Sequence, residues 1–214
     1  MAVKAEDVLY HLAKGQREGA EALLPLAELA LREMKAAVNF RVLYRRLYID
    51  LAEDGIEADG VALISRSLKK RMEGCREALF FAATLGAEVD RLIARESLLE
   101  MSRAVILEAA ANAVLEDELN AWHNEINNGL TECSLALTPR FCPGYGDWSL
   151  EDLERVLKLA QAHRIGLALT ENSMLVPAKS IAGAIGIYEG LRTEQWNKCG
   201  ECGLLSCRFR KEQQ

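Results

Sequence analysis

The stretch that decides how this chain folds and binds reads Arg140-Phe141-Cys142-Pro143-Gly144-Tyr145-Gly146-Asp147-Trp148. We expect neither a helix nor a strand here, because Pro143 fixes its own φ and lacks an N–H, and Gly144 and Gly146 permit backbone angles closed to other residues. The stretch therefore predicts a tight, rigid turn. Such a turn can hold a flat, charged small molecule, since it brings an arginine, two aromatic rings and bare backbone amides together. The alternative is a structural loop in which Arg140 caps a neighbouring group.

The elements around this turn mix helices and strands in no regular order. Apolar residues at helical spacing predict helices across 5–35, 67–73, 87–93 and 102–127, with Pro25 starting a new helix or kinking one. Alternation or short apolar runs predict strands across 38–51, 61–64, 78–85, 133–137, 165–169 and 180–188. Ser149 and Asp152 form a capping-box-like start to a further helix through Ala162. This mixture favours an α+β fold, with a mixed, largely antiparallel twisted sheet flanked by helices and a helical N-terminal segment.

Length and composition limit the class of protein. The 214 residues suit one domain with an added helical segment, and half of them are apolar, which is enough for a sizeable core. We divide the chain into a helical segment at 1–37, a principal domain at 38–190 and a cysteine-containing tail at 191–214. The net charge of −6 and the absence of a lysine-rich tract argue against a nucleic-acid partner. We recognise no signal peptide and no membrane-spanning apolar run, so we expect a cytoplasmic protein without a membrane partner.

The tail carries a cluster of cysteines. Cys199, Cys202 and Cys207 have a spacing at which thiolates can share one metal ion, with Cys133 or Cys142 as a fourth ligand. A zinc ion would make this cluster a structural clip, whereas an iron–sulfur cluster would make it an electron port. The alternative is a set of reduced thiols, which cytoplasmic proteins commonly carry.

Two further motifs follow the turn, and they read Leu169-Thr170-Glu171-Asn172-Ser173 and Pro177-Ala178-Lys179-Ser180-Ile181. In this order and separation the turn and the motifs resemble the activation domain of cobalamin-dependent methionine synthase, whose first motif reads Arg-Pro-x-Pro-Gly-Tyr and whose second reads Leu-Thr-Glu-Ser. The segment from Phe80 to Asp90 looks like that of free-standing family members, in which the domain is a separate small protein. The resemblance runs from about Leu79 to the C-terminus, so we expect the principal domain to be activation-like.

The resemblance implies roles for residues of the turn. Arg140 matches the family arginine that binds the carboxylate of S-adenosylmethionine, and a guanidinium offers a planar fork to such a group. The backbone around Cys142 and Gly144 would face the adenosyl part of that ligand. Tyr145 matches the family tyrosine that lies near the cobalamin face. The alternatives are a surface ion pair for Arg140 and a core position with a satisfied hydroxyl for Tyr145.

Two acids outside the turn are also candidates. Glu116 matches a family glutamate near the bound S-adenosylmethionine, where a carboxylate suits the ammonium and sulfonium charges of the ligand. Its alternative role is that of a solvated helix acid, because Asp117 and Glu118 sit beside it. Glu171 follows a predicted buried strand, and it either binds the ligand or anchors the next turn.

As a whole, the resemblance implies a reactivation module for a corrinoid methyltransferase. Such a module docks over the cobalamin of a corrinoid-binding methionine synthase subunit, flavodoxin or ferredoxin delivers an electron to cob(II)alamin, and S-adenosylmethionine donates a methyl group. No general base or nucleophile is needed on this chain, because the cofactor supplies the reactive chemistry. Two alternatives come from other classes. One is a metal-binding interaction protein whose S-adenosylmethionine site has decayed, and the other is a stand-alone S-adenosylmethionine methyltransferase.

Overall fold

The computed structural model describes residues 3–12 and 21–190. These residues form two compact units. The helical unit contains the described residues up to Asn39 together with Glu88–Glu118, and the sheet unit contains Phe40–Ala87 and the described residues from Leu119 onward. The domain boundaries drawn from the sequence, 37/38 and 190/191, stay a prediction.

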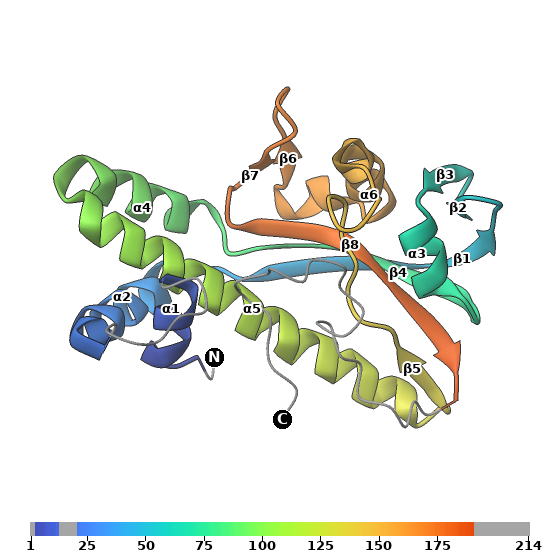
Figure 1. Cartoon of the computed structure of the whole chain (residues 1–214), viewed down its shortest axis with the longest axis horizontal. Helices are drawn as coiled ribbons and strands as arrows, with labels where there is room; N and C mark the ends of the chain where they lie inside the picture. Colours follow the sequence, from blue (N-terminus) through green and yellow to red (C-terminus); the bar gives the residue numbers. More distant parts are fainter. Residues whose placement is uncertain (1–2, 13–20, 191–214) are drawn as a thin grey trace. The chain divides into compact units, whose positions relative to one another are not determined.

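The helical unit consists of α1 (Ala5–Leu12), α2 (Leu24–Ala37), most of α4 (Ala87–Leu99) and the first part of α5 (Met101–Thr131), which are labelled in Figure 1. The helices expected in these regions are confirmed. Pro25 lies in the first turn of α2, where its missing N–H has no helical hydrogen bond to lose. Each helix turns an apolar face inward, and the buried side chains include Val8, Met34, Val89 and Leu107.

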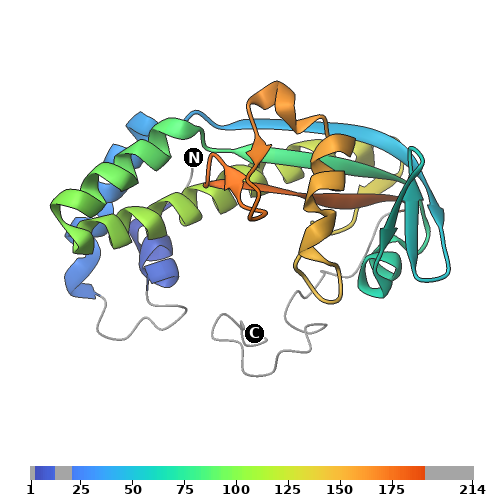
Figure 2. The ribbon, with the colours of Figure 1, turned by 90° about the horizontal axis from the view of Figure 1, so that it is seen from above.

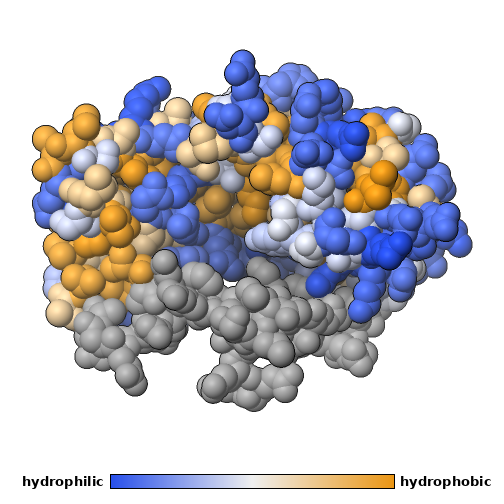
Figure 3. Space-filling model, turned by 45° about the horizontal axis from the view of Figure 1, so that its top comes forward, coloured by the Kyte–Doolittle hydropathy of each residue, from blue (hydrophilic) through white to orange (hydrophobic). Residues whose placement is uncertain are grey.

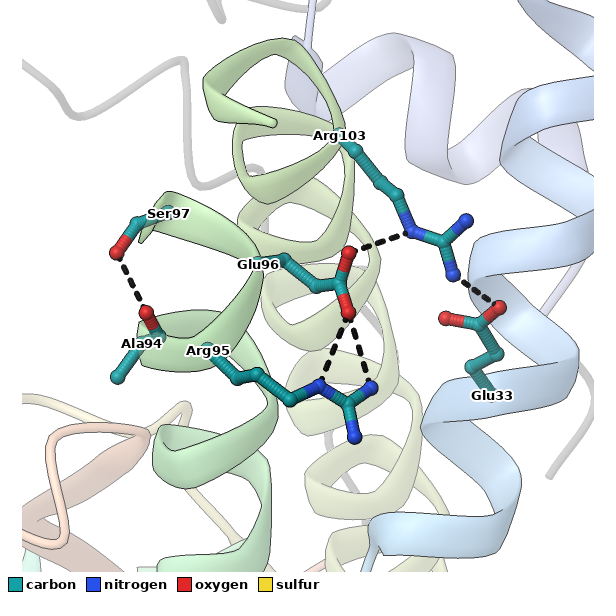
Figure 4. A network of polar contacts seen from close by, with 6 residues as sticks. All are labelled: Glu33, Ala94, Arg95, Glu96, Ser97 and Arg103. Atoms are coloured by element: carbon teal, nitrogen blue, oxygen red, sulfur yellow. Dashed lines mark hydrogen bonds and ion pairs between the residues drawn. The ribbon is translucent and has the colours of Figure 1, made fainter. Parts of the chain in front are cut away.

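A buried carboxylate links three helices of this unit. Glu96 of α4 accepts hydrogen bonds from Arg95, with distances of 3.1 Å from Nε and 2.9 Å from Nη2, as Figure 4 shows. Arg103 of α5 places its Nε 3.0 Å from the other oxygen of Glu96 and its Nη2 against Glu33 of α2. The Nε–H of Arg103 is not aligned for a hydrogen bond, so its contact with Glu96 is an ion pair only. Two arginines therefore balance the charge of Glu96, whose side chain is only 8% exposed.

The corner between α4 and α5 exposes apolar side chains. Leu98, Leu99 and Met101 are 88%, 74% and 64% exposed. Only Glu100 separates the two helices, and Figure 3 shows the apolar surface that results over this corner. Clustered exposed apolar residues are typical of surfaces that contact other molecules.

The sheet unit is built on a six-stranded sheet with the strand order β3-β2-β1-β4-β8-β5, and all of its pairings are antiparallel. Figure 2 shows β4 between β1 and β8. The strands are β1 (Arg41–Leu51), β2 (Gly55–Ala58), β3 (Val61–Ile64), β4 (Cys75–Thr84), β5 (Leu135–Leu137) and β8 (Ser180–Glu189). The predicted α+β fold, with an antiparallel sheet flanked by helices and helices at the N-terminus, is confirmed.

Both faces of the sheet are covered. On one face, α3 (Arg66–Met72), α6 (Leu153–Leu159) and a 3-10 turn, η3 (Ala162–Ile165), enclose a core that contains Phe80 and Trp148. On the opposite face, the part of α5 that follows Leu119 packs Trp122 against Phe81 and Tyr44, with ring centroids 5.4 and 5.7 Å apart. Figure 1 shows α6 and this part of α5 on opposite sides of β8. The turn at 140–148 lies where the chain passes from β5 to α6.

Some local expectations are wrong. The strand predicted at 165–169 is mostly absent, because η3 occupies its start and β6 contains only Ala168–Leu169. β6 pairs with β7 (Leu175–Val176), which the sequence did not indicate, in a separate two-stranded hairpin. The helix expected through Ala162 begins as a 3-10 turn, η2 (Leu150–Asp152), and α6 ends at Leu159. Within 3–12 and 21–190, no helix is long and apolar enough to cross a membrane.

Candidate functional site

The turn at 140–148 is tied to the sheet and closed by its own backbone. Phe141 exchanges two hydrogen bonds with Ala184 of β8, at 2.9 and 2.8 Å. The Gly144 N–H donates to the Trp148 carbonyl at 2.8 Å, and the Trp148 N–H donates to the Tyr145 carbonyl at 3.0 Å. Gly144 adopts a φ of 90°, in the region that favours glycine. The turn is therefore tight, as the sequence predicted.

Aromatic packing fixes the base of the turn and leaves its tip exposed. The ring of Phe141 stacks on Trp148, with centroids 5.8 Å apart and planes at 10°, and the Arg71 guanidinium lies 5.3 Å from the Phe141 centroid. The Trp148 Nε1–H donates to Asp152 at 3.0 Å, so Asp152 holds the indole and does not complete a capping box. Tyr145 contacts Phe141 edge-on at 6.1 Å and is 46% exposed. The tyrosine ring is therefore available at the surface.

Asp147 joins the turn to α3. Its Oδ1 accepts hydrogen bonds from the Ser65 hydroxyl at 2.6 Å and the Ser67 N–H at 3.0 Å, and its Oδ2 accepts from the Arg66 N–H at 3.0 Å. These donors, the Ser65 hydroxyl first, hold the pKa of Asp147 well below its usual range. The carboxylate thus satisfies backbone N–H groups at the start of α3 from another part of the chain.

Arg140 reaches from the turn to α5. Its Nη1 donates to the Leu119 carbonyl at 3.0 Å, and its Nη2 donates to the Asn120 Oδ1 at 2.7 Å. These two contacts fix the plane and the position of a guanidinium that is only partly exposed. Both terminal nitrogens of Arg140 therefore donate to α5, and the guanidinium is a cation held in one position.

His123 is a second polar group of this site, and sequence reasoning missed it. It lies four residues after Leu119 and three after Asn120, which puts it on the same side of α5 as the residues that hold Arg140. Burial, with a smaller contribution from the charge of Arg140, lowers the pKa of His123 to about 4. The imidazole is therefore neutral near pH 7. Its Nδ1 is buried and has no hydrogen-bond partner among the residues that the structure describes.

Cys142 points into the sheet unit. Its Sγ would come within 2.8 Å of a Cβ at Gly183 of β8, and the Phe141 carbonyl oxygen would come within 2.4 Å of the same atom. Only glycine at this position allows the turn to lie so close to β8. Cys142 is therefore buried beneath the turn, whereas Cys133 is exposed.

The two acidic candidates belong to other elements than the turn. Glu171 is exposed in the β6–β7 connection, which is closed by a Thr170 N–H hydrogen bond to the Met174 carbonyl at 2.9 Å. Glu116 belongs to the helical unit, where it lies 3.7 Å from the Nε2 of His11. Burial lowers the pKa of His11, while Glu116 and Asp7 partly offset this effect.

The structure thus brings four of the candidates suggested by the sequence, Arg140, Cys142, Gly144 and Tyr145, into one turn. The tail candidates Cys199, Cys202 and Cys207 lie outside the described residues. Within the described ranges, no group of three or more histidine, cysteine or acidic side chains is placed to hold a metal ion. What the turn and α5 offer chemically is a fixed cation, a neutral imidazole and an exposed aromatic ring. This combination suits binding of an anionic group next to a flat ring system.

The fold has a counterpart among solved structures. A crystal structure of the MetH reactivation domain bound to AdoHcy matches this chain with a TM-score of 0.59. The match covers 91% of this chain and 78% of that chain, at 14% sequence identity. At this identity the likeness shows the fold alone, and the fold of this chain therefore resembles that of a reactivation domain. No family model and no curated protein matches the sequence.

Proposed function

We propose that this protein is a reactivation module for a cobalamin-dependent methyltransferase, most directly methionine synthase, and that it binds S-adenosylmethionine or S-adenosylhomocysteine (AdoHcy). The observation that carries the proposal is the likeness of fold to a reactivation domain with bound AdoHcy, which extends over nine-tenths of this chain. The module would position the methyl donor against the cobalt of a corrinoid carried by its partner, and flavodoxin or ferredoxin would supply the electron. Positioning and exclusion of water are the contributions of this chain, because the cofactor supplies the chemistry.

The turn supports this proposal at the level of residues. Arg140 is fixed by two hydrogen bonds to α5, and a carboxylate that binds there would replace or join these contacts. The exposed Tyr145 ring at the tip suits a contact with the flat face of a corrin. Glu116 and Glu171 are proposed as further ligand contacts from the motif resemblance alone.

A titration with AdoHcy tests the binding step. In calorimetry the unmutated protein should bind AdoHcy, and Arg140→Ala should weaken binding by about 1.5–3 kcal/mol, because a charge-assisted hydrogen bond to a carboxylate is lost. Arg164→Ala is the matched control, since it removes the same charge from an exposed arginine, whose Nη1 donates to the Gln161 Oε1 at 3.2 Å. We expect the control to bind AdoHcy as the unmutated protein does.

The alternative functions predict different outcomes. Absence of AdoHcy binding by the unmutated protein would favour an interaction protein whose ligand site has decayed. Methylation of a small acceptor from S-adenosylmethionine without any corrinoid partner would favour a stand-alone methyltransferase. Equal loss of binding in Arg140→Ala and Arg164→Ala would mean that general charge, and not the turn, attracts the ligand.

A further inference from the structure

The sheet unit contains a buried ring nitrogen, the Nδ1 of His123. This atom is enclosed and lacks a hydrogen-bond partner among the described residues. An enclosed polar atom without a partner is unfavourable, and in native proteins such atoms are often found at functional sites. Trp122, the preceding residue, packs its ring against Phe81 and Tyr44, which holds this turn of α5 against the sheet. The position of the imidazole is therefore fixed from one side.

Arg140 is the charged side chain that acts on His123. Its guanidinium hydrogen-bonds to Leu119 and Asn120, which lie one helical turn before His123 on the same side of α5. The charge of Arg140 is also felt at the imidazole. The Arg140 cation and the neutral imidazole of His123 are therefore both found at the same part of α5.

We propose that His123 is a ligand-binding residue whose imidazole accepts a hydrogen bond from the ammonium group of an α-amino acid head group, while Arg140 binds the carboxylate of the same head group. This inference rests on the proposed function, since the methionine part of S-adenosylmethionine is such a head group. Carboxylate and ammonium are attached to one carbon, so their partners must lie within a few ångströms of each other. Arg140 hydrogen-bonds to α5 one turn before His123, close enough for its charge to act on the imidazole.

The chemistry of the pair fits the two charges of the head group. An ammonium group donates hydrogen bonds and accepts none, so its partner must be an acceptor, which a neutral imidazole nitrogen is. A second cation beside Arg140 would repel the ammonium, and His123 avoids this because it is uncharged near pH 7. The head group would supply the partner that Nδ1 lacks.

Ligand analogues separate this role from a merely structural one. The probes are AdoHcy, an analogue in which hydrogen replaces the amino group, and an analogue in which hydrogen replaces the carboxylate. Calorimetry should show that His123→Phe weakens AdoHcy binding about 10-fold, as expected for loss of a hydrogen bond to a charged group. The same substitution should leave binding of the analogue without the amino group unchanged. His123→Asn, which keeps a polar side chain, should recover part of the loss.

Arg140→Ala provides the complementary measurement. It should weaken binding of AdoHcy and of the analogue without the amino group, but not of the analogue without the carboxylate. In the unmutated protein, the ¹⁵N chemical shift of the His123 imidazole should change more on addition of AdoHcy than on addition of the analogue that lacks the amino group.

The outcomes distinguish this inference from the proposed function. If the unmutated protein binds AdoHcy but His123→Phe weakens both amino-containing and amino-free ligands equally, His123 has a structural role only and the inference is wrong. The same conclusion follows if His123→Phe, shown to be folded by its thermal unfolding transition, binds AdoHcy as tightly as the unmutated protein. If the unmutated protein binds no AdoHcy, the proposed function fails first and this inference fails with it.

Discussion

Removal of the His123 imidazole should change how the stability of the protein depends on pH. In the folded chain the pKa of His123 is lowered from 6.5 to about 4, because burial and the charge of Arg140 disfavour the protonated ring. The unfolded chain therefore binds more protons than the folded chain between these two values. The free energy of unfolding falls as the pH is lowered through this window, and the contribution of His123 is complete above pH 6.5.

The size of the effect follows from the two pKa values. At pH 5.0 the imidazole is almost fully protonated in the unfolded chain and protonated in about one folded molecule in ten. The linkage relation then gives an upper limit of about 2 kcal/mol for the stability lost between pH 7.5 and pH 5.0 through this one group. Partial exposure of the ring to solvent screens its charge, so we expect about 1–2 kcal/mol.

Urea unfolding at pH 7.5 and pH 5.0 measures this loss. His123→Gln should lose about 1–2 kcal/mol less stability than the unmutated protein between the two pH values, because glutamine does not titrate. His11 titrates in both proteins, so its contribution cancels. An equal loss in His123→Gln and the unmutated protein would refute the burial argument for His123.

Three further predictions concern the helical unit, the turn and the tail. Arg103→Ala should destabilise the protein by about 1–3 kcal/mol in urea unfolding, since it leaves Glu96 with one arginine. The control Arg91→Ala breaks the exposed pair with Glu88 and should cost less than about 0.5 kcal/mol. Equal costs would mean that the contacts of Arg103 with Glu96 and Glu33 do not stabilise the helical unit. Gly183→Ala should lower the free energy of unfolding by about 1–3 kcal/mol in thermal unfolding, because its Cβ would collide with the Phe141 carbonyl. The control Gly129→Ala, in α5, places a Cβ that meets nothing within 4 Å and should be neutral or stabilising. The reverse order of stabilities would mean that the turn is not held against β8. If Cys199, Cys202 and Cys207 bind a metal, protein prepared without oxygen should contain about one zinc per chain by elemental analysis. Iron with acid-labile sulfide would instead indicate an electron port. Absence of any metal would indicate reduced thiols.

Long, periodic elements were predictable from the sequence, and short ones were not. The alternation of apolar and polar residues after Val38 locates β1, and the apolar run from Ala78 locates β4, because each spans enough residues for a period to be visible. β6 and β7 contain two residues each, which is too few for any period. They pair across the short connection at 170–174, but two residues in each strand give no alternation to detect.

Contacts between distant residues limited the prediction of the site. The composition of the turn indicated its shape, since proline and glycine act locally. The contact of Asp147 with Ser65 joins residues 82 positions apart, and no spacing rule reveals it. His123 carries no motif at all. His123 becomes a candidate because its Nδ1 is buried and because Arg140 hydrogen-bonds to the same helix. Only the folded chain shows these two facts. The sequence does place His123 three residues after Asn120 and four after Leu119, on one side of a helix. This spacing is informative only when Arg140 is known to hydrogen-bond to Leu119 and Asn120.

Reductive methylation in a reconstituted system tests the central claim most directly. The protein is mixed with a corrinoid-binding methionine synthase subunit in the cob(II)alamin state, S-adenosylmethionine and reduced flavodoxin, and the absorbance of methylcobalamin is followed. We predict that methylcobalamin forms only when this protein, the corrinoid subunit and S-adenosylmethionine are all present, and that Arg140→Ala slows its formation while Arg164→Ala does not. Methylcobalamin formation that is equally fast without this protein, or no formation with every component present and AdoHcy binding demonstrated, would contradict the assignment as a reactivation module.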